Sequence, residues 1–152
     1  MKLIFAIILI LLVPLSSHSL CVKTEKAFLR SGPGTKYKKT WTVGKYMPLK
    51  EIGKKGNWFM VKDLDNKKHW VHKKLVSANL SCVVVSTRYT KLRKGPGRNY
   101  PLADIRNVDK YTPFKKIGRE DSWVFLEDDL GHQYWTYDKH IWQPLHYVNV
   151  SY

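Results

Sequence analysis

The sequence predicts an all-β protein made of two small, similar domains in tandem behind an N-terminal signal peptide. Three observations lead to this prediction. The chain repeats itself once, each copy divides into short β-rich segments, and the first twenty residues have the layout of an export signal. A chain of 152 residues is long enough for one ordinary domain or two very small ones, and the repeat favours two.

The N-terminus has the composition of a secretory signal peptide. Lys2 gives a positive start, residues 3–13 form an unbroken apolar run, and Pro14 is followed by small or polar residues. The run is too short for a permanent helix across a bilayer about 30 Å thick. Ser17 and Ser19 are suitable small residues for a cleavage site after Ser19. We therefore predict a signal peptide over residues 1–19 and an exported protein, periplasmic or secreted, with no permanent membrane anchor.

Two alternatives accompany that prediction. One is lipidation of Cys21, which would need a small residue directly before it, where Leu20 stands. The other alternative is an N-terminal anchor that is retained.

The chain has two cysteines, Cys21 and Cys82. An even number in an exported protein indicates a disulfide, and two separate buried thiols are the alternative.

An internal repeat covers most of the remaining chain. Residues 29–34, Leu-Arg-Ser-Gly-Pro-Gly, recur 63 positions later as Leu-Arg-Lys-Gly-Pro-Gly at 92–97. Farther on, residues 46–53 correspond to 111–118 with an offset of 65. The two tryptophans that end each copy are 12 residues apart in both: Trp58 and Trp70, then Trp123 and Trp135. Two copies of this size predict two domains side by side rather than a solenoid, which needs three or more repeats.

Each copy is expected to fold into short strands. In the first copy, β-rich segments cover residues 40–43, 47–52, 58–61 and 69–72, and residues 63–66 have turn composition. No long stretch has the apolar spacing of an amphipathic helix. Short strands separated by turn residues are typical of a small barrel or sandwich.

The order Leu-Arg-x-Gly-Pro-Gly-x-x-Tyr, then a Trp after a glycine turn, then Trp-Val-His resembles the bacterial SH3-like domain family. Residues 23–77 carry the pattern nearly in full and residues 86–143 more loosely. The family usually has Gly before the second Trp, where this chain has His69 and Tyr134. The resemblance implies two tandem SH3-like β-barrels, over residues 20–82 and 83–152. The Gly-Pro-Gly segments are expected to reverse the chain, using glycine's freedom to adopt positive φ.

In such a barrel the first and last strands run close together, so the resemblance implies that Cys21 pairs with Cys82. Their Cα atoms should then lie about 4.4–6.8 Å apart.

The sequence shows no recognisable set of catalytic residues. With both cysteines assigned a structural role, a Cys/His nucleophile is not expected, and no residues are left to form a separate catalytic domain. His69 and His72 should point to opposite faces of a strand, and no metal site or cofactor is predicted. The carboxylates of residues 127–129 precede Leu130 and Gly131 and are interpreted as a hairpin turn. We therefore predict a protein that is not an enzyme.

The charge is positive and uneven. The formal net charge is +15. Residues 20–81 hold 15 Lys or Arg against 4 Asp or Glu, and residues 82–152 hold 11 against 8. This imbalance predicts an anionic partner for the first half, and solubility alone is the alternative. Nucleic acid fits the charge, but export argues against it.

The resemblance implies a ligand groove walled by a loop tyrosine and by the Trp that begins the middle strand. These are Tyr37 and Trp58 in the first copy and Tyr100 and Trp123 in the second. Trp58 and Trp123 can serve equally as core, and Trp70 and Trp135 are expected in the core. The predicted ligand-binding set adds the lysines of two flanking loops in the first copy: Lys36, Lys38, Lys39, Lys54 and Lys55. With only Arg119 as a nearby cation and Asp121 beside Trp123, the second copy is expected to bind less well.

Two functions fit these predictions. The first is a non-enzymatic secreted module that binds an anionic or sugar-rich cell-envelope polymer such as peptidoglycan. The alternative is a periplasmic or extracellular adaptor that binds a peptide or protein through the groove or a sheet edge. Binding through lysines should weaken with salt, whereas a mainly apolar protein interface should not.

Overall fold

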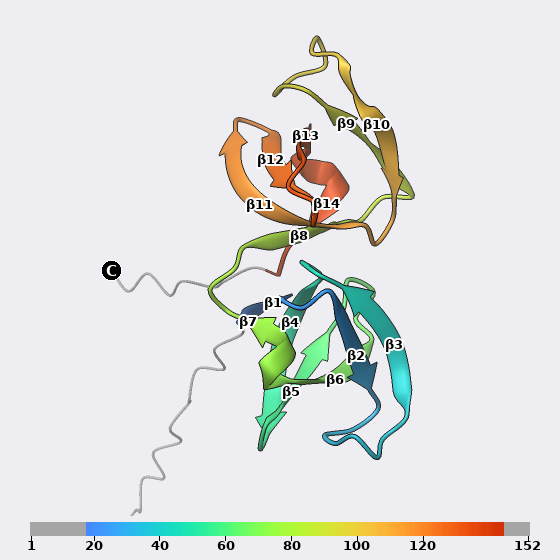
Figure 1. Ribbon diagram of the computed structural model, residues 1–152. Helices are drawn as coiled ribbons and strands as arrows, with labels where there is room; N and C mark the ends of the chain where they lie inside the picture. Colours follow the sequence, from blue (N-terminus) through green and yellow to red (C-terminus); the bar gives the residue numbers. More distant parts are fainter. Residues whose placement is uncertain (1–17, 145–152) are drawn as a thin grey trace, which may run out of the picture.

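The computed structural model describes residues 18–144 and is all-β, with two curled sheets of seven strands each. The predicted signal peptide, residues 1–19, lies outside the described residues apart from His18 and Ser19. The two sheets lie one above the other in Figure 1, and the chain passes from the first to the second through β8. The predicted fold class, two tandem small SH3-like domains, is confirmed.

The first sheet has the strand order β3-β2-β6-β5-β4-β1-β7 and the 3-10 helix η1 before its last strand. Its elements are β1 (Ser19–Val22), β2 (Lys26–Arg30), β3 (Lys39–Gly44), β4 (Pro48–Lys55), β5 (Trp58–Lys62), β6 (Lys68–His72), η1 (Lys73–Leu75) and β7 (Val76–Ser77). The four segments predicted to be strands in this copy become β3, β4, β5 and β6.

The second sheet has the matching order β10-β9-β13-β12-β11-β8-β14. Its elements are β8 (Cys82–Val85), β9 (Tyr89–Arg93), β10 (Leu102–Asp109), β11 (Pro113–Glu120), β12 (Trp123–Glu127), β13 (Gln133–Tyr137), η2 (Asp138–His140) and β14 (Ile141–Trp142). Because every strand has a counterpart in the same place, the sequence repeat is also a repeat of topology. Cys82 already belongs to the second sheet.

The change of repeat offset from 63 to 65 has a structural cause in β10. This strand has 8 residues, whereas its counterpart β3 has 6. The pairing of β10 with β9 shifts between Leu102 and Asn107, and the extra residues bulge there. The bulge exposes Ile105 at 49% of its surface.

Apolar side chains from the inner faces of the strands form two cores, and Val84 of β8 belongs to the first of them. Leu29, Leu49 and Val61 are fully buried in the first, and Leu92 and Leu126 in the second. A domain of about 60 residues buries a smaller share of its surface than a larger domain does and is marginally stable alone.

The hairpin turns confirm the interpretation of the carboxylate run. Asp128 Oδ1 accepts hydrogen bonds from the backbone N–H groups of Leu130 and His132. These bonds lower the pKa of Asp128, against the effect of burial, which alone would raise it. Asp63 caps the equivalent turn of the first domain.

The residues that replace the family's usual glycine lie against those turn carboxylates. His69 and Tyr134 are both buried, and each places a polar side-chain atom against the aspartate of its own domain's turn. His72 lies on the opposite face of β6 from His69, as predicted from their spacing.

The Gly-Pro-Gly segments reverse the chain as predicted, but the reason given for their glycines is wrong. Neither Gly32 nor Gly95 is among the positive-φ residues. Instead, the ring of Tyr37 lies over Gly32, where a Cβ atom would be 2.4 Å from Cδ1 of Tyr37. Glycine is therefore required because the tyrosine ring approaches the backbone.

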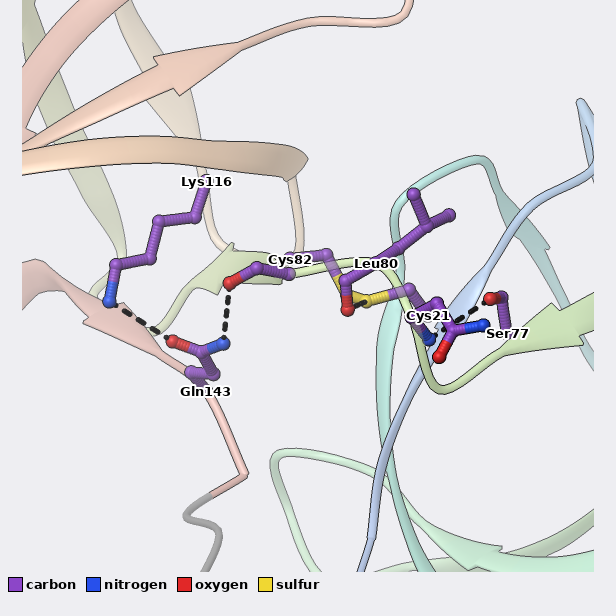
Figure 2. Close-up of a disulfide and its surroundings, with 8 residues drawn as sticks. Cys21, Ser77, Leu80, Cys82, Lys116 and Gln143 are labelled. Carbon is purple, nitrogen blue, oxygen red and sulfur yellow. Dashed lines mark hydrogen bonds between the residues drawn. A yellow bond between two sulfur atoms is a disulfide. The ribbon is translucent and has the colours of Figure 1, made fainter.

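The predicted disulfide is present. Cys21 in β1 and Cys82 in β8 are bonded, with their Cα atoms 6.0 Å apart. Figure 2 shows the bond at the passage from the first sheet to the second. Gln143, which follows β14, donates a hydrogen bond to Ser81 beside it and accepts one from Lys116. The disulfide thus ties the first strand of one domain to the first strand of the other.

Tyr111 connects the two domains on the side of β3. Its ring meets Trp41 edge-to-face at 4.9 Å between centroids, and its hydroxyl donates a hydrogen bond to Asp65. Lys110 adds an ion pair with Asp65 at 2.9 Å. Tyr111 has a positive φ of 73°, and its counterpart Tyr46 has one of 68°. The same backbone conformation therefore places Tyr111 at the contact between the domains and Tyr46 against the disulfide.

Removal of the disulfide should destabilise the protein. Replacing both Cys21 and Cys82 with serine releases a closed loop with a sequence separation of 61 residues. On the chain-entropy model this lowers the free energy of unfolding by about 4 kcal/mol. Guanidinium unfolding followed by circular dichroism measures the change, with reduced and oxidised wild type as controls. An unchanged midpoint would contradict the prediction.

The contact between Tyr111 and Asp65 should make the stability of the protein depend on pH in the acid range. Hydrogen bonds from Tyr111 and Lys110 hold the pKa of Asp65 below its ordinary value, while burial and Asp65 raise the pKa of Tyr111. In the unfolded chain the pKa of an aspartate is about 4. Because the pKa of Asp65 is lower in the folded protein, its contribution to stability is complete above the unfolded-state pKa and is lost as the pH falls through the folded-state pKa. The Tm of wild type should therefore fall more steeply below about pH 4 than the Tm of Asp65→Asn. Asp104→Asn, whose carboxylate is 99% exposed, is the matched control. Parallel curves for wild type and Asp65→Asn would exclude the contact.

Candidate functional site

Half-buried aromatic side chains cover the outer face of two neighbouring strands in each domain. In β6 the buried residues are His69 and Val71, so the alternation of a strand places Trp70 on the other face. Trp135 has the same position in β13. The expectation that these two tryptophans belong to the core is therefore wrong, because the inner positions are taken by their neighbours.

The tryptophans that begin the middle strands lie on the same outer face. Trp58 meets His72 edge-to-face at 5.1 Å between ring centroids. In the second domain Trp123 lies 5.9 Å from the ring of Tyr137. Both tryptophans are half-buried, so each keeps a surface that a ligand can reach.

A groove of about 480 Å³ opens beside Trp123 in the second domain. It is lined by residues from β9, the loop after β9, β12, β13 and η2: Tyr89, Thr90, Lys91, Arg93, Arg98, Trp123, Tyr137 and His140. Three of these side chains are cationic, four carry aromatic rings, and none is a carboxylate. Tyr89 is 54% exposed at the rim. The groove therefore offers ring surfaces for stacking together with positive charge.

A buried hydrogen-bond network holds the floor of this groove. The hydroxyl of Thr90 lies 2.8 Å from the hydroxyl of Thr136 and 2.8 Å from Nδ1 of His140. The hydroxyl of Thr136 also donates to the carbonyl oxygen of Lys91. Thr90 and Thr136 are 1% and 0% exposed, and a satisfied network of buried groups fixes its members in place. The ring of His140 is therefore held at the groove.

The first domain has no counterpart of that network. The positions equivalent to Thr90, Thr136 and His140 hold the apolar residues Ala27, Val71 and Leu75. Two groove walls also differ, because Phe28 stands at the position of Lys91 and Thr35 at that of Arg98. With the same strand order, the second domain therefore has a more polar and more cationic site at this place than the first domain has.

The predicted loop tyrosines are fixed in their own loops. The guanidinium of Arg30 donates to the carbonyl oxygens of Thr35 and Tyr37, and Arg93 donates to that of Tyr100. Tyr37 is 38% exposed and Tyr100 is 43% exposed. Both loops are built alike, and Tyr100 is not among the residues that line the groove.

Two of the predicted lysines contact aromatic rings, and two others lie opposite aromatic residues in the register of the β4–β5 hairpin. Lys36 lies 5.5 Å from the ring of Tyr37, and Lys39 lies 3.6 Å from that of Phe28. Lys55 pairs across the hairpin with Trp58, and Lys54 pairs with Phe59.

Lys38 contributes its carbonyl oxygen, which accepts a hydrogen bond from the N–H of Ser31. The ring contact that Trp58 makes in the described part of the chain is with His72 rather than Tyr37. The predicted ring of lysines around one aromatic pair is thus not seen as a single cluster of contacts.

Sequence reasoning identified Trp123 but missed the cations and the polar floor around it. The net charge of residues 82–152 does not indicate these cations, because the acidic residues of that half offset the charges of Lys91, Arg93 and Arg98. A position-by-position comparison of the two copies contains the missing signal: the buried Ala27 and Val71 and the half-buried Leu75 of one copy are polar in the other.

Metal-binding clusters and membrane-spanning helices are absent from residues 18–144. This part of the chain contains no group of three or more His, Cys, Asp or Glu side chains arranged to hold a metal ion. It also contains no helix of the length and apolar character needed to cross a membrane. Both cysteines are in the disulfide.

Comparison with protein families identifies the first copy. Residues 25–77 match the family model described as the bacterial SH3 domain. No curated protein sequence matches the chain significantly.

Among solved structures, the chain is similar to NlpC1 from Trichomonas vaginalis, with a TM-score of 0.37 and 10% identity over 85% of this chain and 46% of that one. NlpC2 from the same organism has a TM-score of 0.37 and 10% identity over 90% and 52%. The chain thus spans about half the length of these two proteins. The structure described as Endolysin LysPBC5 CBD has a TM-score of 0.32 and 17% identity over 85% and 95%.

Proposed function

Residues 25–77 belong to the bacterial SH3 domain family, and from this assignment we propose that the protein is an exported, non-catalytic module that binds cell-envelope polymer such as peptidoglycan. The single observation that carries the proposal is the groove beside Trp123, in which aromatic rings and three cations surround a fixed polar floor.

The groove suits an anionic or sugar-rich polymer. The faces of Trp and Tyr rings pack against the apolar faces of sugars, while their polar edges stay available to hydroxyl groups. Lys91 and Arg98 are exposed and can approach carboxylate or phosphate groups of a chain that lies along the groove. Positive charge also speeds the encounter with a polyanion.

The two domains are proposed to contribute unequally. In the first, Trp58 with Lys54 and Lys55, and Tyr37 with Lys36, Lys38 and Lys39, form a second candidate surface for the same polymer. The charge of the first half, taken from the sequence alone, favours that surface over the groove at Trp123. The geometry favours the reverse order, because the groove at Trp123 has a hydrogen-bonded floor where the first domain has Ala27 and Leu75.

The competing function is an adaptor that binds a peptide or protein through the same groove. An adaptor would use mainly apolar contacts and show weak salt dependence. The cations around Trp123 favour the polymer, and the two ligand types are distinguished by the salt response.

Trp123→Ala should abolish binding to purified cell walls with the fold intact by circular dichroism, because it removes the central wall of the groove. Trp58→Ala, the same change at the equivalent position, is the matched control and should reduce binding less. Arg98→Glu should weaken binding and flatten its salt dependence. Co-sedimentation with purified walls at increasing NaCl measures all three. Unchanged binding in Trp123→Ala and Arg98→Glu, beside retention of a protein from an envelope extract, would favour the adaptor.

Export is proposed to end with cleavage after Ser19, so that the mature protein begins at Leu20. Ser19 pairs with Lys50 in β1, and Glu51 donates its backbone N–H to His18. Cleavage after Ser19 removes these contacts but keeps Leu20, Cys21 and Val22 in the strand.

N-terminal sequencing of the protein from culture medium or periplasm should therefore return Leu-Cys-Val. A start at His18 would mean that processing preserves the whole of β1. Recovery of Met1, or a lipidated Cys21, would contradict release from the membrane.

A further inference from the structure

A second hollow, of about 520 Å³, lies between the two domains and is separate from the groove at Trp123. Its walls are largely apolar. Trp41 and Met47 line it from the first domain, and Val108, Phe114 and Tyr134 line it from the second. The interdomain contact between Tyr111 and Trp41 forms part of the same wall, so the hollow depends on the way the two domains are held together.

The rim of this interdomain cleft exposes large apolar side chains. Leu130 is 79% exposed and Ile105 is 49% exposed, and both line the cleft. Ile105 lies in the bulge of β10 that distinguishes the second copy from the first. Apolar side chains that gather at a hollow, instead of being scattered singly, mark a surface that a partner covers.

The charge of the cleft is opposite to that of the protein. Three carboxylates line it, those of Glu25, Asp128 and Asp129, against one ammonium group, that of Lys45. Lys45 is 3.4 Å from Glu25 and neutralises it in part. Asp129 is exposed and makes no ion pair within residues 18–144. In a chain of net charge +15, this is a locally negative site that attracts a cation.

Both domains present an edge strand to the cleft. β3 and β10 are the end strands of their sheets. Three successive residues of β3, at positions 42–44, line the cleft. Because side chains alternate along a strand, three in succession indicate that the open edge itself borders the hollow. An open edge offers backbone N–H and C=O groups to an extended peptide.

We propose that the interdomain cleft binds an extended peptide in which an apolar side chain lies next to a lysine, an arginine or a free amino group. The apolar side chain occupies the hollow between Trp41 and Phe114, and the cation lies near Asp129. This ligand has the opposite charge from the polymer proposed for the groove, so the cleft adds a second specificity that rests on the interdomain contact.

Two short peptides test the charge requirement. Acetyl-Leu-Lys-Leu-amide should shift the backbone amide signals of Val43, Ile105 and Leu130 in ¹H–¹⁵N correlation spectra of the full mature protein. Acetyl-Leu-Glu-Leu-amide, which differs only in the sign of its charge, should shift them less at the same concentration. Equal shifts from both peptides, or shifts confined to the groove residues, would overturn the proposal.

Two surface variants test the residues. Asp129→Asn and Ile105→Ser should each raise the Kd of the lysine peptide about fivefold, the loss expected for one exposed ion pair or apolar contact. Asp121→Asn, an exposed carboxylate in a different hairpin of the same domain, is the matched control and should leave the Kd unchanged. An unchanged Kd in both cleft variants, with Tm preserved, would reject the site.

The test of peptide binding at the cleft is independent of the test of polymer binding at the groove. Trp123→Ala should bind the lysine peptide as well as wild type does, and Ile105→Ser should bind purified cell walls as well as wild type does. If Trp123→Ala loses the peptide, the cleft is not its site, whatever happens to wall binding.

Discussion

The attachment of the two domains to each other is the constraint on which the rest of the structure depends. Each domain has about 60 residues and buries little apolar surface alone. The disulfide ties β1 to β8, and on the other side Tyr111 contacts Trp41 and Asp65. Two attachments at separate places restrict rotation between the domains. They also give a lasting shape to the cleft between them, which neither domain forms alone.

Duplication followed by divergence explains how one frame supports two different surfaces. The strand order is the same in both sheets, and the arginine that holds the loop tyrosine is present in both. Two groups of differences bear on the surfaces described above. Ala27, Val71 and Leu75 become Thr90, Thr136 and His140 at the groove floor, and two residues are added in β10. Side chains at the groove floor thus differ between the copies, while the strand order of the two sheets is the same.

The sequence was informative about the frame because the frame depends on local chemistry. Alternating apolar residues, glycine turns and the repeat predict the strands, and an even number of cysteines together with the family resemblance predicts the disulfide. The site was harder, because a groove forms where residues from β9, β12 and η2 meet, and charge totals do not record where cations gather. Trp70 and Trp135 lie outside the core, although large aromatic side chains favour burial, because strand alternation places Val71 and Thr136 inward. The signal peptide and its cleavage site stay predictions.

We propose the groove beside Trp123 as the main site of polymer binding. The most direct measurement is a titration of the ¹⁵N-labelled mature protein with soluble fragments of digested cell wall, followed residue by residue. We expect the largest shifts at Lys91, Arg98, Trp123 and His140, with smaller shifts around Trp58. Shifts that centre on Trp58 and Lys55 while those around Trp123 stay unchanged would contradict it, as would the absence of any shift at saturating fragment.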